Sequence, residues 1–166
     1  KNEDCDIVTP QPEDLVSPAL YATLSQSSTD PYNGPLEVLP CETNGSFYIG
    51  NYTAKGKQVP FPAYYLITNG IGKSQKYPLR LPVGTYNVIY WGYPDYFGTA
   101  GDAYLADPTL IIGKKLNTTS LGLRKIPGDT VYYPIHSLVY GTQNINIGKD
   151  DLQAHLKHAS AALSVI

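Results

Sequence analysis

The residues that could carry chemistry are few and scattered in this chain of 166 residues. The histidines are His136, His155 and His158, and neither cysteine has a second cysteine or a histidine at the spacing of a zinc ligand. The sequence has no Gly-x-Ser-x-Gly turn and no cysteine beside a suitable base. We therefore expect no catalytic residue, no metal site and no cofactor, and we expect that the protein is not an enzyme.

The segment Gly72-Lys73-Ser74 has the last three residues of a phosphate-binding loop. The full motif needs a glycine five positions before Gly72, where this sequence has Ile67, and Pro78 arrives before a helix could form. The pair Asn69-Gly70, just upstream, is typical of the two-residue turn in a β-hairpin. We therefore interpret the segment as part of a hairpin.

A run of aromatic residues follows one predicted strand and allows two interpretations. Trp91, Tyr93 and Tyr96 could face a sugar, because aromatic rings with polar edges suit carbohydrate. On a strand, however, Tyr86 and Tyr90 share one face and can cover the edge of the core. We favour the interpretation in which the aromatic side chains cover the core. Sugar binding by Trp91, Tyr93 and Tyr96 is the alternative.

Composition excludes several classes of protein. Twelve basic and fourteen acidic side chains give a net charge of −2 without a block of like charge, which argues against a nucleic-acid binder. No apolar run reaches the 18 or more residues of a membrane-spanning helix. The chain has 15 Tyr but 3 Phe, and its 15 Gly and 14 Pro do not suit long helices. This composition is typical of an exported or cell-surface β protein.

Two further observations bear on export. The chain contains no Met, so we expect that Lys1 is not the translation start and that a leader has been removed. In an exported chain the pair Cys5 and Cys41 suggests a disulfide, with two free thiols as the alternative. The bridge would close a loop of about 36 residues and contribute about 3–4 kcal/mol on the chain-entropy model.

Short apolar-alternating segments recur between turn signals, and each predicts a strand. The apolar pattern is loose over residues 92–129, so we expect a long connection between strands there. Residues 150–162 fit either a helix or a strand. We expect one domain over residues 1–166, an all-β antiparallel β-sandwich of about seven strands with long loops. The predicted strands lie at 18–24, 36–39, 46–49, 51–53, 62–68, 85–91, 131–133, 137–141 and 144–147.

Three stretches carry a resemblance to a known family. The segment from Leu81 to Trp91 reads Leu-Pro-Val-Gly-Thr-Tyr followed by an apolar strand and tryptophan. Together with residues 129–141 and 152–166, it resembles the fimbrillin superfamily of Bacteroides-type bacteria, and most closely the fimbrial anchoring-subunit family. The resemblance implies a transthyretin-like sandwich that forms the N-terminal domain of an anchor-type protein. Members of the family usually carry a second β domain, so this chain is either a short member or lacks that second domain.

The resemblance also implies a function. It predicts a non-enzymatic fimbrial or pilus subunit for cell adhesion, most closely the outer-membrane lipoprotein anchor, held by a lipid on a cysteine upstream of Lys1. Its partners would be fimbrial subunits that join it by β-strand addition. No Lys or Arg lies between Asn2 and Ala54, so the cut that matures shaft subunits could not fall before Lys55. The alternative is a secreted or surface carbohydrate-binding module.

Overall fold

Strand β10 (Gly84–Gly92) lies near the centre of the main sheet. The computed structural model describes residues 10–24, 30–43, 47–74, 77–94, 105–106, 110–115, 122–123 and 138–158. Within it, β10 pairs antiparallel along its whole length with β13 (Val139–Ile147) and along most of it with β4 (Gly34–Glu42). Its Val, Ile, Tyr and Trp side chains favour a pleated, half-buried backbone. The predicted strand at 85–91 is confirmed.

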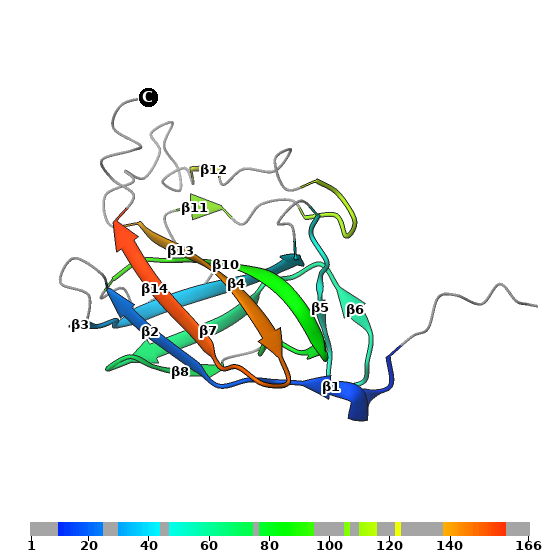
Figure 1. The fold of residues 1–166 in the computed structure, drawn as a ribbon. Helices are drawn as coiled ribbons and strands as arrows, with labels where there is room; N and C mark the ends of the chain where they lie inside the picture. The colour runs from blue at the N-terminus through cyan, green and yellow to red at the C-terminus, as the bar shows by residue number, and fades with distance from the viewer. Residues whose placement is uncertain are drawn as a thin grey trace, which may run out of the picture.

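Seven strands close into a barrel-like sheet (Figure 1). The ring runs through β14 (Leu152–His158), β13, β10, β4, β7 (Ala63–Thr68), β8 (Ile71–Ser74) and β2 (Leu20–Leu24), with β3 (Asp30–Pro31) paired beside β2. A parallel pairing of β2 with β14 completes the ring. The all-β class is confirmed, whereas the expected sandwich is corrected to a barrel-like closed sheet. The reason is this parallel pairing, which joins the two ends of the described chain and which local sequence patterns do not report.

Short elements flank the barrel. The 3₁₀ turn η1 (Pro12–Asp14) precedes β1 (Leu15–Val16), which pairs with β9 (Leu81–Pro82). A second small pair is formed by β5 (Asn51–Tyr52) and β6 (Gln58–Val59). A third is formed by β11 (Leu105–Ala106) and β12 (Gly122–Leu123).

The ambiguous segment after residue 150 begins as a strand. In β14, Leu152, Ala154 and Leu156 are fully buried and alternate with exposed neighbours, which is the period of two that a half-buried strand requires. Upstream, the predicted strands at 137–141 and 144–147 are one strand, β13. The prediction at 131–133 lies outside the described residues.

The predicted hairpin at Asn69-Gly70 is confirmed. Asn69 has φ 51° and Gly70 has φ 81°, and the two join β7 to β8. Positive φ at both central residues is the conformation of a type I′ hairpin turn. Gly70 also donates to the Tyr32 carbonyl and accepts from the amide of Ala22, so the turn is bonded to β2 and to the residue after β3.

The barrel interior explains much of the tyrosine content. Tyr90 and Val88 are fully buried, and Tyr86 packs against the same core. The favoured interpretation of Tyr86 and Tyr90 as core-facing side chains is therefore confirmed. Their hydroxyls find partners: Tyr90 donates to Oε1 of Gln143 at 2.6 Å, and Tyr86 donates to the Pro82 carbonyl at 2.8 Å. Tyrosine suits this core because a buried hydroxyl is tolerated when it is hydrogen-bonded.

Candidate functional site

The predicted ligand-facing aromatics lie mostly inside the structure. Trp91 is 5% exposed and Tyr93 is 3% exposed, while Tyr96 lies outside the described residues. Neither Trp91 nor Tyr93 offers an open ring face on which a sugar could stack. A ligand-facing role for the three stays a prediction, which the burial of Trp91 and Tyr93 does not favour.

Cys41 is fully buried on β4 and carries a free thiol. Burial raises the pKa of this thiol to about 11, so the reactive thiolate form is disfavoured. Cys5 lies outside the described residues, and the bridge between Cys5 and Cys41 stays a prediction.

The described part of the chain shows neither a cluster of metal ligands nor a membrane-spanning helix. No three His, Cys, Asp or Glu side chains gather there in a way that could hold a metal ion. His155 instead lies with Nδ1 2.9 Å from the Thr23 hydroxyl, across the parallel pairing of β14 with β2. The described residues also include no helix of the length and apolarity that crossing a membrane requires.

The contact between β2 and β8 is a surface that could accept another chain, and we call it the β2–β8 seam. These strands pair at one position, Tyr21 opposite Ile71, whereas β10 and β13 pair at nine. Beyond Ile71, no strand in the described ranges pairs with the β2-facing side of β8. The contact between β2 and β8 is therefore short, with Leu20 of β2 lying close against Gly72 of β8.

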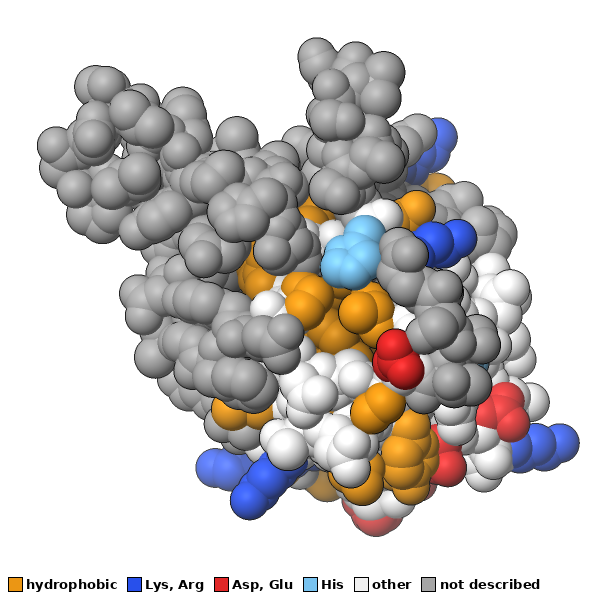
Figure 2. Space-filling model, turned by 90° about the vertical axis from the view of Figure 1, so that its left-hand side faces the viewer, with side chains coloured by type: hydrophobic (Ala, Val, Ile, Leu, Met, Phe, Trp, Pro, Cys, Tyr) orange, Lys and Arg blue, Asp and Glu red, His pale blue; other side chains and the backbone are white. Residues whose placement is uncertain are grey.

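Apolar side chains lie on both sides of the β2–β8 seam. Ile71 is 61% exposed and Tyr21 is 40% exposed, although both sit in strands of the closed sheet. Figure 2 shows hydrophobic side chains gathered in the middle of the neighbouring face of the barrel, where β3 lies in Figure 1. Exposed apolar groups beside a short strand contact are what a strand-adding partner would cover.

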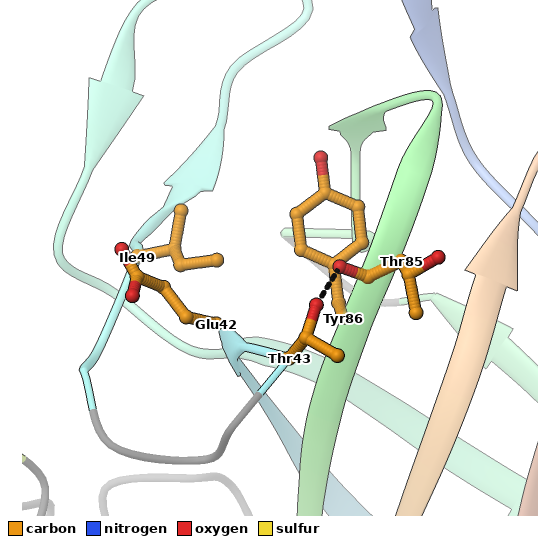
Figure 3. Close-up of a pocket in the computed structure, with 5 residues that line it drawn as sticks. All are labelled: Glu42, Thr43, Ile49, Thr85 and Tyr86. Atoms are coloured by element: carbon orange, nitrogen blue, oxygen red, sulfur yellow. Dashed lines mark hydrogen bonds between the residues drawn. The ribbon is translucent and has the colours of Figure 1, made fainter.

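A groove of about 450 Å³ lies at the other end of the barrel, where β4 ends and β10 begins. Figure 3 shows Glu42 and Ile49 on one side of it and Tyr86 on the other, with Thr43 and Thr85 at its base. We call this the Glu42–Tyr86 groove.

Local pairing explains why the Glu42–Tyr86 groove is open. The ladder between β4 and β10 ends at the pair of Glu42 with Tyr86. The chain then returns along β4, where the Ile49 N–H donates a hydrogen bond to the Pro40 carbonyl. Just past the ladder, the Thr43 hydroxyl donates to the Thr85 carbonyl at 2.7 Å. A side chain thus occupies a position that a backbone N–H would take in a continuing sheet.

Sequence reasoning missed the Glu42–Tyr86 groove because its residues come from three separate segments. Apart from Tyr86, none of the five stood out in the sequence. The ladder end that brings Glu42, Ile49 and Thr85 together is a tertiary feature, and no local motif marks it.

These surfaces define a class of protein. The described residues offer a short contact between two strands, exposed apolar groups and a groove. The molecule is an all-β protein with surfaces that another chain could cover.

The comparison with family sequence models identifies the family. The model of the fimbrillin-A associated anchor proteins Mfa1 and Mfa2 matches residues 9–166, all but the first eight residues. The chain therefore belongs to this family, as the resemblance at its C-terminal half predicted. It is a fimbria-associated protein of a structural family, which places it at the cell surface. Neither the curated proteins nor the solved structures gave a match.

Proposed function

We propose that this protein is the outer-membrane lipoprotein that anchors a fimbria, and that a fimbrial subunit joins it by β-strand addition at the β2–β8 seam. The observation that carries the proposal is the family match over residues 9–166. The protein acts through backbone pairing and apolar contact rather than by side-chain catalysis.

The β2–β8 seam is favoured because it is the weakest contact in the ring. Strand addition needs unpaired N–H and C=O groups along an edge, with apolar side chains beside them. The pairing of β2 with β8 is limited to one residue pair, and the exposed side chains of Ile71 and Tyr21 lie at that pair. A partner strand that enters here displaces one residue pair and gains a ladder with β8.

Lipid anchoring is the finer part of the proposal. It is supported by family membership and by the absence of Lys and Arg between Asn2 and Ala54, where a trypsin-like protease would have to cut to remove the first strand. An uncut N-terminal segment keeps β2 in the ring, and a lipid on an upstream cysteine would tether that segment to the membrane.

A disulfide across the seam tests the mode of assembly. The amide of Ala22 bonds to the Gly70 carbonyl, which makes Tyr21 and Ile71 a non-hydrogen-bonded pair with closely spaced Cα atoms. The double variant Tyr21→Cys with Ile71→Cys can therefore form a bridge that locks the seam. We expect the oxidised protein to take up no fimbrial subunit, and the reduced protein to regain uptake.

The controls are the two single cysteine variants and the same double variant held in reductant. Uptake of subunits by the oxidised double variant, with its bridge verified by mass, would contradict addition at this seam. We do not propose the carbohydrate-binding alternative, because Trp91 and Tyr93 are buried.

A further inference from the structure

The Glu42–Tyr86 groove has the size and openness to receive one long side chain. Its volume of about 450 Å³ falls within the range of small-ligand sites in proteins. Ile49 and Tyr86 are partly buried in its walls, while Glu42, Thr43 and Thr85 are exposed. The groove therefore combines apolar walls with polar groups at the solvent side.

The residues that line the Glu42–Tyr86 groove carry negative charge and no positive charge. Glu42 is the charged residue among those that line it. Within the part of the chain that the structure describes, Glu42 bonds through its backbone amide to the Phe47 carbonyl, and no partner of its carboxylate is found. A carboxylate at the rim of an otherwise neutral groove favours a cationic ligand.

The walls of the Glu42–Tyr86 groove suit the apolar stem of a basic side chain. Lysine and arginine carry an apolar stem and a charged head, and the stem packs on apolar surface while the head stays in water. Ile49 and the Tyr86 ring face each other across the groove (Figure 3), so a stem can lie between them with its head at Glu42. The ring of Tyr86 also offers a cation a favourable face.

Backbone at the base of the groove fits an extended ligand. The Thr85 carbonyl accepts a hydrogen bond from the Thr43 hydroxyl. Among the described residues, the ladder of β10 with β4 does not extend to Thr85. An incoming extended chain could donate its own N–H to this carbonyl and so fix the depth at which its side chain enters.

We propose that the Glu42–Tyr86 groove binds a lysine or arginine side chain carried by an extended polypeptide segment. The proposed function supplies the source of that segment, a neighbouring fimbrial subunit, but the chemistry of the groove stands independently of it.

A pair of short peptides tests the inference. The first probe is the capped peptide Thr-Val-Arg-Val-Thr, and the matched probe replaces its arginine by citrulline, which has nearly the same shape and no charge. Each is titrated into the isotopically labelled protein while the amide resonances of Thr43, Thr85 and Tyr86 are followed by NMR. We expect saturating shifts at these amides with the arginine peptide and weaker binding of the citrulline peptide.

Two variants sharpen the result. Glu42→Gln should weaken the arginine peptide by about threefold to fivefold, the range of an exposed ion pair, and leave the citrulline peptide unchanged. Glu13→Gln removes the same charge from an exposed position in η1 and should change neither. Equal binding of the two peptides, shifts away from the groove, or no effect of Glu42→Gln would overturn the inference. Uptake of fimbrial subunits is measured separately, so failure of the proposed function is distinguished from failure of the groove.

Discussion

The Tyr90 hydroxyl donates a 2.6 Å hydrogen bond to Oε1 of Gln143, from the barrel interior to the neighbouring strand. The same oxygen accepts the amide of Gln153 at 2.9 Å, and Nε2 of Gln143 donates to the Asp151 carbonyl at 3.2 Å. The side chain of Gln143 therefore joins β13 to β14 near their turn, where a backbone ladder would ordinarily do so.

This arrangement predicts that Gln143→Leu is strongly destabilising. The substitution leaves the buried Tyr90 hydroxyl without a partner, which costs about 1–3 kcal/mol, whereas the exposed Gln153 amide can bond to water instead. We expect the free energy of unfolding, measured with urea, to fall by about 1–3 kcal/mol. Thr142→Val, at the exposed neighbouring position, should change it by less than about 0.5 kcal/mol. Equal effects of the two substitutions would show that Gln143 does not join the strands.

Trp91→Ala should lower the free energy of unfolding. Trp91 is 5% exposed, and truncation of a buried tryptophan typically costs about 3–5 kcal/mol. Tyr140 lies opposite it on β13 and is 40% exposed, so Tyr140→Ala should cost clearly less. Urea unfolding measures both, and a glycan array reports on the alternative function. A stable Trp91→Ala variant that has lost a glycan signal would favour the carbohydrate-binding module.

Gly70→Ala should destabilise the turn between β7 and β8. Gly70 has φ 81°, and an added Cβ would lie 3.1 Å from the Ala22 carbonyl oxygen. Gly113 has a similar φ of 86° with nothing within 4 Å of that position, so Gly113→Ala reports the backbone strain alone. We expect about 1 kcal/mol for Gly113→Ala and more for Gly70→Ala in thermal or urea unfolding. The opposite order would contradict the packing of this turn against β2.

Alkaline pH should weaken the fold. Burial raises the pKa of Tyr86 to about 12 and that of the Cys41 thiol to about 11, and it also raises the pKa of Tyr90. In the unfolded chain these groups lose protons near their ordinary values, about 10 for Tyr and about 8.5 for Cys. The folded state therefore holds more protons, and the free energy of unfolding falls as pH rises above about 9. Urea midpoints that stay constant up to about pH 11 would contradict this burial.

Local sequence signals predicted the parts of the fold that local chemistry decides. The Asn69-Gly70 turn and the strand over 85–91 follow from residues that are adjacent in the sequence. The strand at Leu152 could not be distinguished from a helix, because its alternation is short and its partner β2 lies more than 100 residues earlier. Because of the same long-range pairing, the sheet closes into a barrel-like ring and does not form the expected sandwich.

The candidate site was less predictable. Trp91 and Tyr93 drew attention by residue type, yet they are 5% and 3% exposed. The β2–β8 seam depends on where two strands fail to pair, and the Glu42–Tyr86 groove depends on where one strand ends before its neighbour. Both are properties of register, which a single sequence specifies through many weak contacts rather than through a motif.

The anchor assignment is tested most directly on the natural gene product in the outer-membrane fraction of its host, by intact mass with lipid analysis and identification of the proteins that co-purify. The account predicts an acylated N-terminus, an uncut segment before Lys55 and a co-purifying ladder of fimbrial subunits. A protein without a lipid, found outside the membrane fraction and free of fimbrial subunits, would contradict it.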